Sequence, residues 1–155
     1  MSTTAAQSAP GLKKGDARWF FGMLAVIRAT AADTGGQYTL VEVTAPPNLS
    51  APLHVHYVED EAFLVLEGSA TLYIGDEVIE VGPGDFANGP RDIPHRFDVG
   101  PEGSRMLWVL APSGFENLIE AASVPATTLT VPPPDVLPPA DAGAIVKRFG
   151  NELLV

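Results

Sequence analysis

The sequence of 155 residues contains no cysteine, few basic residues and no long hydrophobic run. The absence of cysteine excludes disulfides, thiolate metal sites and cysteine nucleophiles, so any metal ligands must be nitrogen or oxygen atoms. Nine lysines and arginines stand against 19 aspartates and glutamates, which gives a formal net charge of −10. This charge opposes binding to nucleic acid or to an anionic membrane surface, and it favours a small molecule as the partner.

The N-terminal segment and the overall composition indicate how the chain is organised. Residues 1–16 are small and polar, with no apolar signal-peptide core, and we predict a flexible N-terminal arm there. Because no stretch is long and apolar enough to span a membrane, we expect a cytoplasmic protein. The 46% hydrophobic content suffices for one core, so we predict one barrel over residues 17–115 and a C-terminal segment over residues 116–155.

Short apolar or alternating runs, WFFGMLAVIRA among them, fill residues 19–109 and are separated by turn clusters such as DTGG, APPN, GPGD and GPEG. Many short strands with glycine and proline between them predict an all-β sandwich or barrel. The clearest hairpin is expected at Ile74 to Glu77, because Gly75 at the first central position suits a type II′ turn.

The C-terminal segment has a different composition. FENLIEAAS predicts a short helix, and ADAGAIVKRFG predicts a second helix that ends at Gly150. Between them, VPATTLTVPPPDVLPP contains six prolines, which predicts an extended Pro-rich strap. Two interpretations stay open: the strap packs on the barrel through Val131, Val136 and Leu137, or it is a disordered linker.

Only three histidines occur, and two of them, His54 and His56, are one residue apart. Side chains at i and i+2 of a strand point to the same side, so these two imidazoles are predicted to share one face. In the next run Glu61 and Phe63 share a face by the same rule.

The third histidine, His95, follows the segment GDFANGPRDIP and shares a strand face with Phe97. A lone histidine on an apolar face is more often a hydrogen-bonded core residue than a ligand. Three imidazoles and the Glu61 carboxylate converging inside a barrel, however, suit a divalent first-row metal with positions left open for water, substrate or dioxygen.

The segments HVHYVEDEAFLVLEG and GDFANGPRDIPH resemble the two sequence motifs of the cupin superfamily. The resemblance covers roughly residues 38–110 and implies a double-stranded β-helix, the cupin jelly-roll barrel. It also implies that the metal ligands are His54, His56, Glu61 and His95. One departure is Val99, where the family often has asparagine, at a position that is not a metal ligand.

Outside the motifs, WFFGMLAVIRA, DTGGQYTLVEV, APSGFEN and KRFGNELL resemble small single-domain cupins related to bacterial quercetin dioxygenases. This resemblance implies a dioxygenase that cleaves a flavonol-like or other polyphenolic enol with dioxygen. Glu61 would be both ligand and catalytic base, and Phe63 and Phe97 would line the substrate pocket. The metal would be Fe, Mn, Co, Ni or Zn.

Several alternatives remain at this stage. Some similar cupins resemble polyketide cyclases, which use the metal as a Lewis acid without dioxygen, and others only bind a small molecule. The acids Glu59 and Asp60 are expected to belong to a solvated turn. Cupins often pair, so a homodimer is expected, with the apolar WFF segment at residues 19–21 as a candidate contact.

Overall fold

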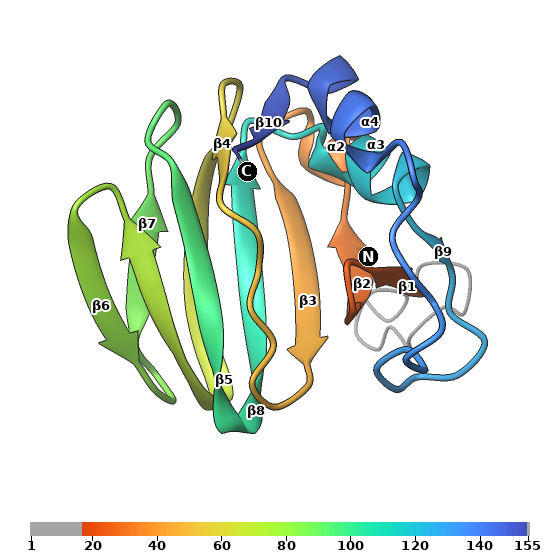
Figure 1. Cartoon of the computed structure of the whole chain (residues 1–155). Helices are drawn as coiled ribbons and strands as arrows, with labels where there is room; N and C mark the ends of the chain where they lie inside the picture. The colour runs from red at the N-terminus through yellow and green to blue at the C-terminus, as the bar shows by residue number, and fades with distance from the viewer. Residues whose placement is uncertain (1–16, 155) are drawn as a thin grey trace, which may run out of the picture.

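The computed structural model describes residues 17–154, and the predicted N-terminal arm lies outside them. The described chain contains ten strands and three short helices (Figure 1). The strands are β1 (Ala17–Phe20), β2 (Met23–Ala29), β3 (Thr39–Ala45), β4 (His54–His56), β5 (Asp60–Ile74), β6 (Glu77–Val81), β7 (Phe86–Gly89), β8 (His95–Ala111), β9 (Val124–Pro125) and β10 (Asn151–Leu153). The helices are α2 (Ala31–Thr34), α3 (Phe115–Ala121) and α4 (Ala142–Arg148).

All strands belong to one antiparallel sheet with the order β10-β4-β8-β3-β2-β1-β9, in which β5 adds pairings to β6, β7 and β8. Figure 1 shows the sheet curling on itself, with α2, α3 and α4 gathered at one end of it. The predicted all-β jelly-roll barrel is therefore confirmed. No helix within residues 17–154 has the length and apolar character needed to cross a membrane.

The longest strands, β5 and β8, pair with each other along nearly their whole length and form the spine of the barrel. Alternate residues of β3, β5 and β8 are buried, which is the period of a strand with one face on a core. The inward faces supply most of a single large core, whose fully buried members include Val41, Phe63, Leu72, Met106 and Leu110.

The spine bends where its register shifts, between Val65 and Glu67 and again between Gly68 and Ala70. Gly68 has φ +75°, and a Cβ built there would lie 2.0 Å from the carbonyl oxygen of Gly103. The two backbones can approach this closely only because residue 68 has no side chain.

The structure can be compared with the predicted hairpin at Ile74 to Glu77 and with the predicted apolar run WFFGMLAVIRA. The turn from Ile74 to Glu77 is present, and because Gly75 has φ 58° while Asp76 is not among the residues with positive φ, type II′ is confirmed. WFFGMLAVIRA, in contrast, is not one run but two strands. Phe21 and Gly22 both have positive φ and form the turn between β1 and β2.

The C-terminal segment contains both predicted helices, α3 and α4. It also contributes β9, which pairs with β1, and β10, which pairs with β4, so the sheet takes two strands from beyond residue 115. In the Pro-rich segment the Thr130 carbonyl accepts a hydrogen bond from Trp19 Nε1 (2.9 Å). Leu137, proposed above as an apolar anchor, is 75% exposed.

Replacing Gly68 by alanine (Gly68→Ala) is expected to lower the free energy of unfolding by at least ~2 kcal/mol, because the new methyl group would combine a left-handed backbone with the clash against Gly103. Chemical denaturation measures the change. The control is Gly143→Ala on α4, where a Cβ meets no atom within 4 Å and a stabilisation of up to about 1 kcal/mol is expected. Equal stability of the two variants would contradict the bend analysis.

Candidate metal centre

Four side chains, His54, His56, Glu61 and His95, meet inside the barrel. One nitrogen or carboxylate oxygen from each lies within 4.8 Å of the other three. All except His54 are buried, and Glu61 is 2% exposed. The four sequence-predicted ligand residues are therefore brought together.

Strand pairing explains how His54 and His95, which are 41 positions apart in the sequence, come to lie side by side. His54 and His56 lie two positions apart on β4, and His54 is the direct partner of His95 in the β4–β8 pairing. The imidazole rings of His56 and His95 stack with their centroids 5.1 Å apart and 4° between their planes. Glu61 comes from β5, which pairs with β8 and, at Glu61 itself, also with Gly89 of β7.

Each imidazole is oriented by a hydrogen bond from its Nδ1 atom. His54 Nδ1 donates to the Pro52 carbonyl (2.8 Å), and His95 Nδ1 makes a longer bond to the Ile93 carbonyl (3.3 Å). A carbonyl oxygen can only accept, so Nδ1 carries the proton in both residues. The unprotonated Nε2 atom of each ring is therefore available as a metal ligand.

His56 is oriented differently, by a buried carboxylate. Its Nδ1 lies 2.8 Å from Oε1 of Glu59, which is 3% exposed. The expectation that Glu59 belongs to a solvated turn is wrong, because the turn after β4 folds this side chain inward onto His56. Asp60 does lie at the surface, where it pairs with Arg91. A carboxylate behind a histidine fixes the ring and raises its basicity, as in many metal sites.

The Glu61 carboxylate is held by two of the imidazoles. Its Oε2 lies 2.9 Å from His56 Nε2 and 3.1 Å from His95 Nε2. Burial alone would raise the pKa of Glu61, but the charge of His56 and the hydrogen bond to His95 outweigh it and hold the pKa well below its usual range.

The two β4 histidines have opposite pKa shifts. Burial, reinforced by the neighbouring His95, lowers the pKa of His54 to about 4. Burial also acts to lower the pKa of His56, but the carboxylates of Glu61 and Glu59 overcome it and raise the pKa to about 9. Near neutral pH, His54 is therefore neutral and His56 carries a proton.

The donor set fits a divalent first-row metal. His56 Nε2 is buried and lacks a hydrogen bond of acceptable geometry, although Glu61 Oε2 is only 2.9 Å away. Once His56 has lost the proton on Nε2, this nitrogen lone pair and the carboxylate oxygen face common space, where a cation between them would bind both. The site offers imidazole and carboxylate donors and no thiolate, the combination that suits Fe, Mn, Co, Ni or Zn.

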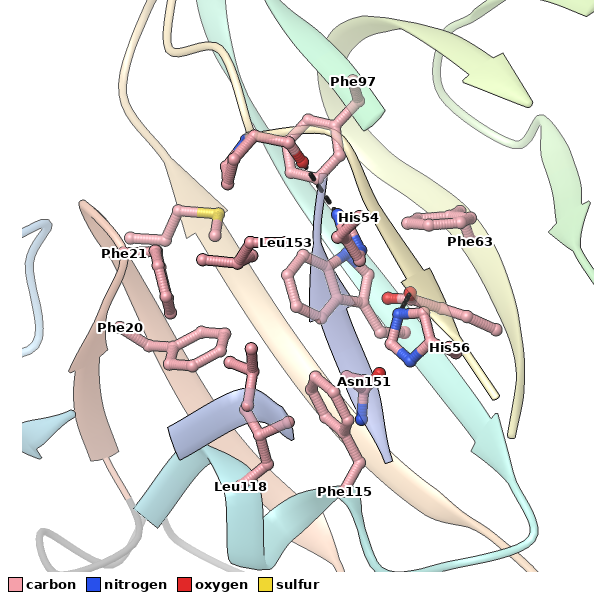
Figure 2. A pocket seen from close by; sticks show the side chains of 15 residues that line it. Phe20, Phe21, His54, His56, Phe63, Phe97, Phe115, Leu118, Asn151 and Leu153 are labelled. Atoms are coloured by element: carbon pink, nitrogen blue, oxygen red, sulfur yellow. Dashed lines mark hydrogen bonds and ion pairs between the residues drawn. The ribbon is translucent and has the colours of Figure 1, made fainter. Parts of the chain in front are cut away.

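A pocket of about 540 Å³, including its open mouth, leads to this cluster. Figure 2 shows His54, His56 and Phe63 on one side of it and Phe20, Phe21 and Leu118 on the other. Its lining residues are Phe20, Phe21, Met23, Pro52, His54, His56, Glu61, Phe63, Phe97, Trp108, Phe115, Leu118, Val146, Asn151 and Leu153.

Phe63 and Phe97, the two predicted pocket residues, lie beside the cluster in a group of aromatic rings. The Phe63 centroid is 5.8 Å from that of His95 and 6.2 Å from that of Trp108, and Phe97 is 6.1 Å from Trp108. On the other side, Phe115 is 5.4 Å from His56. The contacts around Phe63 and Trp108 are edge-to-face and that of Phe115 is tilted, and together they hold the rings in place as an apolar wall.

The residues that sequence reasoning missed come from the two ends of the described chain. Phe20 and Phe21 lie on the β1–β2 hairpin, whereas Phe115 lies on α3 and Asn151 on β10. None of them belongs to the two cupin motifs. They do lie in the segments WFFGMLAVIRA, APSGFEN and KRFGNELL, whose resemblance to small single-domain cupins gave no role in the pocket to any of these residues.

Comparison with known proteins agrees with this geometry. Residues 41–110 match the cupin domain model. The chain is 29% identical over 99 residues to quercetin 2,3-dioxygenase of Bacillus subtilis (strain 168), covering 64% of this chain and 29% of that protein. It is 30% identical over 111 residues to quercetin 2,3-dioxygenase of Aspergillus japonicus, covering 67% and 32%. The chain thus spans about a third of the length of the curated relatives it matches.

Solved structures show the same fold. Oxalate decarboxylase from Bacillus subtilis superposes with a TM-score of 0.56 and 27% identity, over 63% of this chain and 27% of that chain. KdgF from Halomonas sp. superposes with a TM-score of 0.55 over 60% of this chain and 81% of that one; its 19% identity makes it a likeness of fold alone. The chain carries a cupin domain and resembles quercetin 2,3-dioxygenases in sequence.

Zinc binding at about pH 7 is expected to release about one proton, because His56 must lose its proton before Nε2 can bind a metal, whereas His54 is already neutral. Calorimetric titrations in two buffers of different ionisation enthalpy count the protons. The release is expected to fall towards zero as the pH rises through about 9. Binding at neutral pH with no proton released would contradict this description of His56.

Removing the negative charge of the buried Glu59 (Glu59→Gln) is expected to weaken metal binding by about 10- to 100-fold, because the neutral amide can still accept from His56 Nδ1 but no longer raises the basicity of the ring. Competition with a chromophoric chelator measures the affinity, and a thermal melt establishes that the variant is folded. The control is Asp60→Asn, which removes the neighbouring surface carboxylate and should bind metal as the wild type does. Equal losses in the two variants would refute the role of Glu59.

Proposed function

We propose that this cupin is a metal-dependent dioxygenase that cleaves a flavonol-like or other polyphenolic enol with dioxygen. The observation that carries the proposal is the meeting of three imidazoles and the Glu61 carboxylate beside an aromatic-lined pocket. The resemblance to two quercetin 2,3-dioxygenases supports the choice of reaction.

The metal would be held by His54, His56, His95 and Glu61. When bound, a divalent transition metal supplies a Lewis acid and one position at which substrate and dioxygen can be brought together. The donor types admit Fe, Mn, Co, Ni or Zn, and the redox-active members of this group suit a reaction with dioxygen.

Glu61 would act as the base that takes the proton of the substrate hydroxyl. The imidazoles hold the pKa of Glu61 low, and in the loaded site a bound cation would favour the ionised carboxylate in the same way, which is the form a base requires. Rotation of the carboxylate away from the cation would remove that stabilisation and restore its affinity for a proton. The same side chain can therefore serve as ligand and base in turn.

The aromatic wall would position the substrate and keep water out. Phe63 and Phe97 present ring edges and faces on one side, and Phe20 and Phe115 close the opposite side. Planar rings stack favourably in such a slot, and excluding water strengthens the electrostatic interactions at the centre. The expected partners are a small aromatic substrate and dioxygen. The cytoplasmic location and the homodimer stay predictions.

The dimer contact suggested by the WFF segment is constrained by the fold. Phe20 is buried in the core, and Phe21 lines the pocket. Trp19 packs on a small second cluster that contains Leu24 and Val26. A contact through this segment would therefore use only the parts of Trp19 and Phe21 that remain exposed.

The proposal is tested by oxygen uptake with quercetin as substrate, using apo-protein reconstituted separately with Fe(II), Mn, Co, Ni and Zn. We expect uptake matched by flavonol loss with at least one redox-active metal and none with zinc. His95→Ala should abolish it by loss of a ligand, and Glu61→Gln should lower kcat at least ~100-fold by loss of the base. Glu80→Gln, an exposed carboxylate on β6, serves as the matched control.

Other results of these experiments would indicate a different function or a different catalytic base. Conversion of substrate in the absence of air would replace the dioxygenase with a cyclase or isomerase that uses the metal as a Lewis acid. Binding of quercetin without conversion by any metal form would leave a binding protein. Full turnover by Glu61→Gln would remove the assignment of the base while leaving the reaction intact.

A further inference from the structure

Two buried polar atoms beside the metal cluster have no hydrogen-bond partner among residues 17–154: Oδ1 of Asn151 and Nε1 of Trp108. Both residues line the pocket, and they are only 5% and 4% exposed. Leaving a buried donor or acceptor unpaired is costly, and most such atoms in folded proteins find a partner. A partner that arrives with the ligand would account for both atoms.

Asn151 is placed next to the centre by strand pairing. It is the direct partner of His56 in the β10–β4 pairing, so their side chains are neighbours on the sheet. Its Nδ2 donates to the Phe149 carbonyl at the end of α4 (3.1 Å). Because a carbonyl accepts only from the NH₂ group, this bond fixes the amide orientation and turns Oδ1 away from Phe149. Figure 2 shows Asn151 between Phe115 and His56.

Trp108 lies one aromatic ring further from the cluster. It is the partner of Phe63 in the β5–β8 pairing, and Phe63 in turn contacts His95. The indole nitrogen can only donate, so it requires an acceptor oxygen. Asn151 thus offers an acceptor next to the metal ligands, and Trp108 offers a donor deeper in the aromatic wall.

The charge of the lining limits the ligand further. Glu61 is its only carboxylate, and no lysine or arginine of the described chain lines the pocket. In the loaded site the positive charge would come from the bound metal and not from a lysine or arginine. Away from the metal cluster, recognition of a ligand therefore depends on hydrogen bonds and on contacts with the aromatic rings.

We infer that Asn151 and Trp108 select the substrate: a planar aromatic molecule with a hydroxyl group that donates to Asn151 Oδ1 and a carbonyl or ether oxygen that accepts from Trp108 Nε1. This inference rests on the proposed function and narrows its substrate class. A site that holds a buried acceptor for a hydroxyl group discriminates strongly against an analogue without one, since the acceptor is then left unpaired.

Binding to the zinc form tests the inference, because zinc occupies the site without redox turnover. Two probes are compared by calorimetry at saturating zinc: quercetin, and flavone, which has the same rings and ring carbonyl but no hydroxyl groups. The wild type should bind quercetin at least about tenfold more tightly than flavone. Trp108→Phe should weaken both probes by a similar factor, because both carry the carbonyl.

Two substitutions at position 151 separate recognition from a structural role. Asn151→Leu and Asn151→Asp both lose the bond from Nδ2 to the Phe149 carbonyl, but only Asn151→Asp keeps an oxygen acceptor. We expect Asn151→Leu to weaken quercetin binding about tenfold with flavone binding unchanged, and Asn151→Asp to keep the preference for quercetin. Zinc content and thermal melts of both variants establish that the site is intact.

Several results would overturn the inference: equal binding of the two probes by the wild type, equal loss in the two Asn151 variants, or no loss in Asn151→Leu. The proposed function is tested independently of this inference. If Asn151→Leu loses the preference for quercetin but no metal form takes up oxygen, Asn151 selects the ligand and the dioxygenase proposal is wrong. If oxygen is taken up but Asn151→Leu binds quercetin as the wild type does, the dioxygenase proposal stands and the inference on Asn151 is wrong.

Discussion

A carboxylate buried deep in an apolar barrel is stable only if cations or hydrogen-bond donors surround it, and Glu61 is such a carboxylate. The imidazole nitrogens of His56 and His95 lie 2.9 and 3.1 Å from it, and they come from two other strands. The positions of β4, β5 and β8 relative to one another are therefore tied to this interaction. A bound cation would also supply the positive charge that the buried Glu61 carboxylate requires. The interaction that stabilises the barrel and the proposed metal site therefore lie at the same place.

The rest of the barrel provides a rigid frame for this cluster. The paired spine of β5 and β8 places Glu61 and His95 on the same inner surface, and its bend at Gly68 lets the sheet close around them. Behind the ligands, Glu59 and two backbone carbonyls hold the rings in fixed orientations. Little movement is then needed for four side chains to bind one ion, and preorganised donors of this kind favour tight binding.

The cavity itself is closed by segments from both ends of the described chain. The β1–β2 hairpin supplies Phe20 and Phe21, while α3, α4 and β10 supply Phe115, Val146 and Asn151. One fold can host many functions, so these additions to the barrel can give this chain a pocket of its own. The choice of substrate is therefore expected to depend on the terminal segments more than on the motif residues.

The sequence by itself determined the features that depend on short-range spacing. The two-residue period placed His54 with His56 and His95 with Phe97, the glycine at position 75 defined its hairpin, and the motif spacing identified Glu61. Tertiary structure alone decided the features that depend on pairing between distant segments. Glu59 turned inward although it lies in an acidic run, and WFFGMLAVIRA split at Phe21 and Gly22 because two positive φ angles allow the chain to reverse there. Asn151 reached the centre only because β10 pairs with β4, 95 positions earlier in the chain, and local periodicity carries no information on a partner so distant.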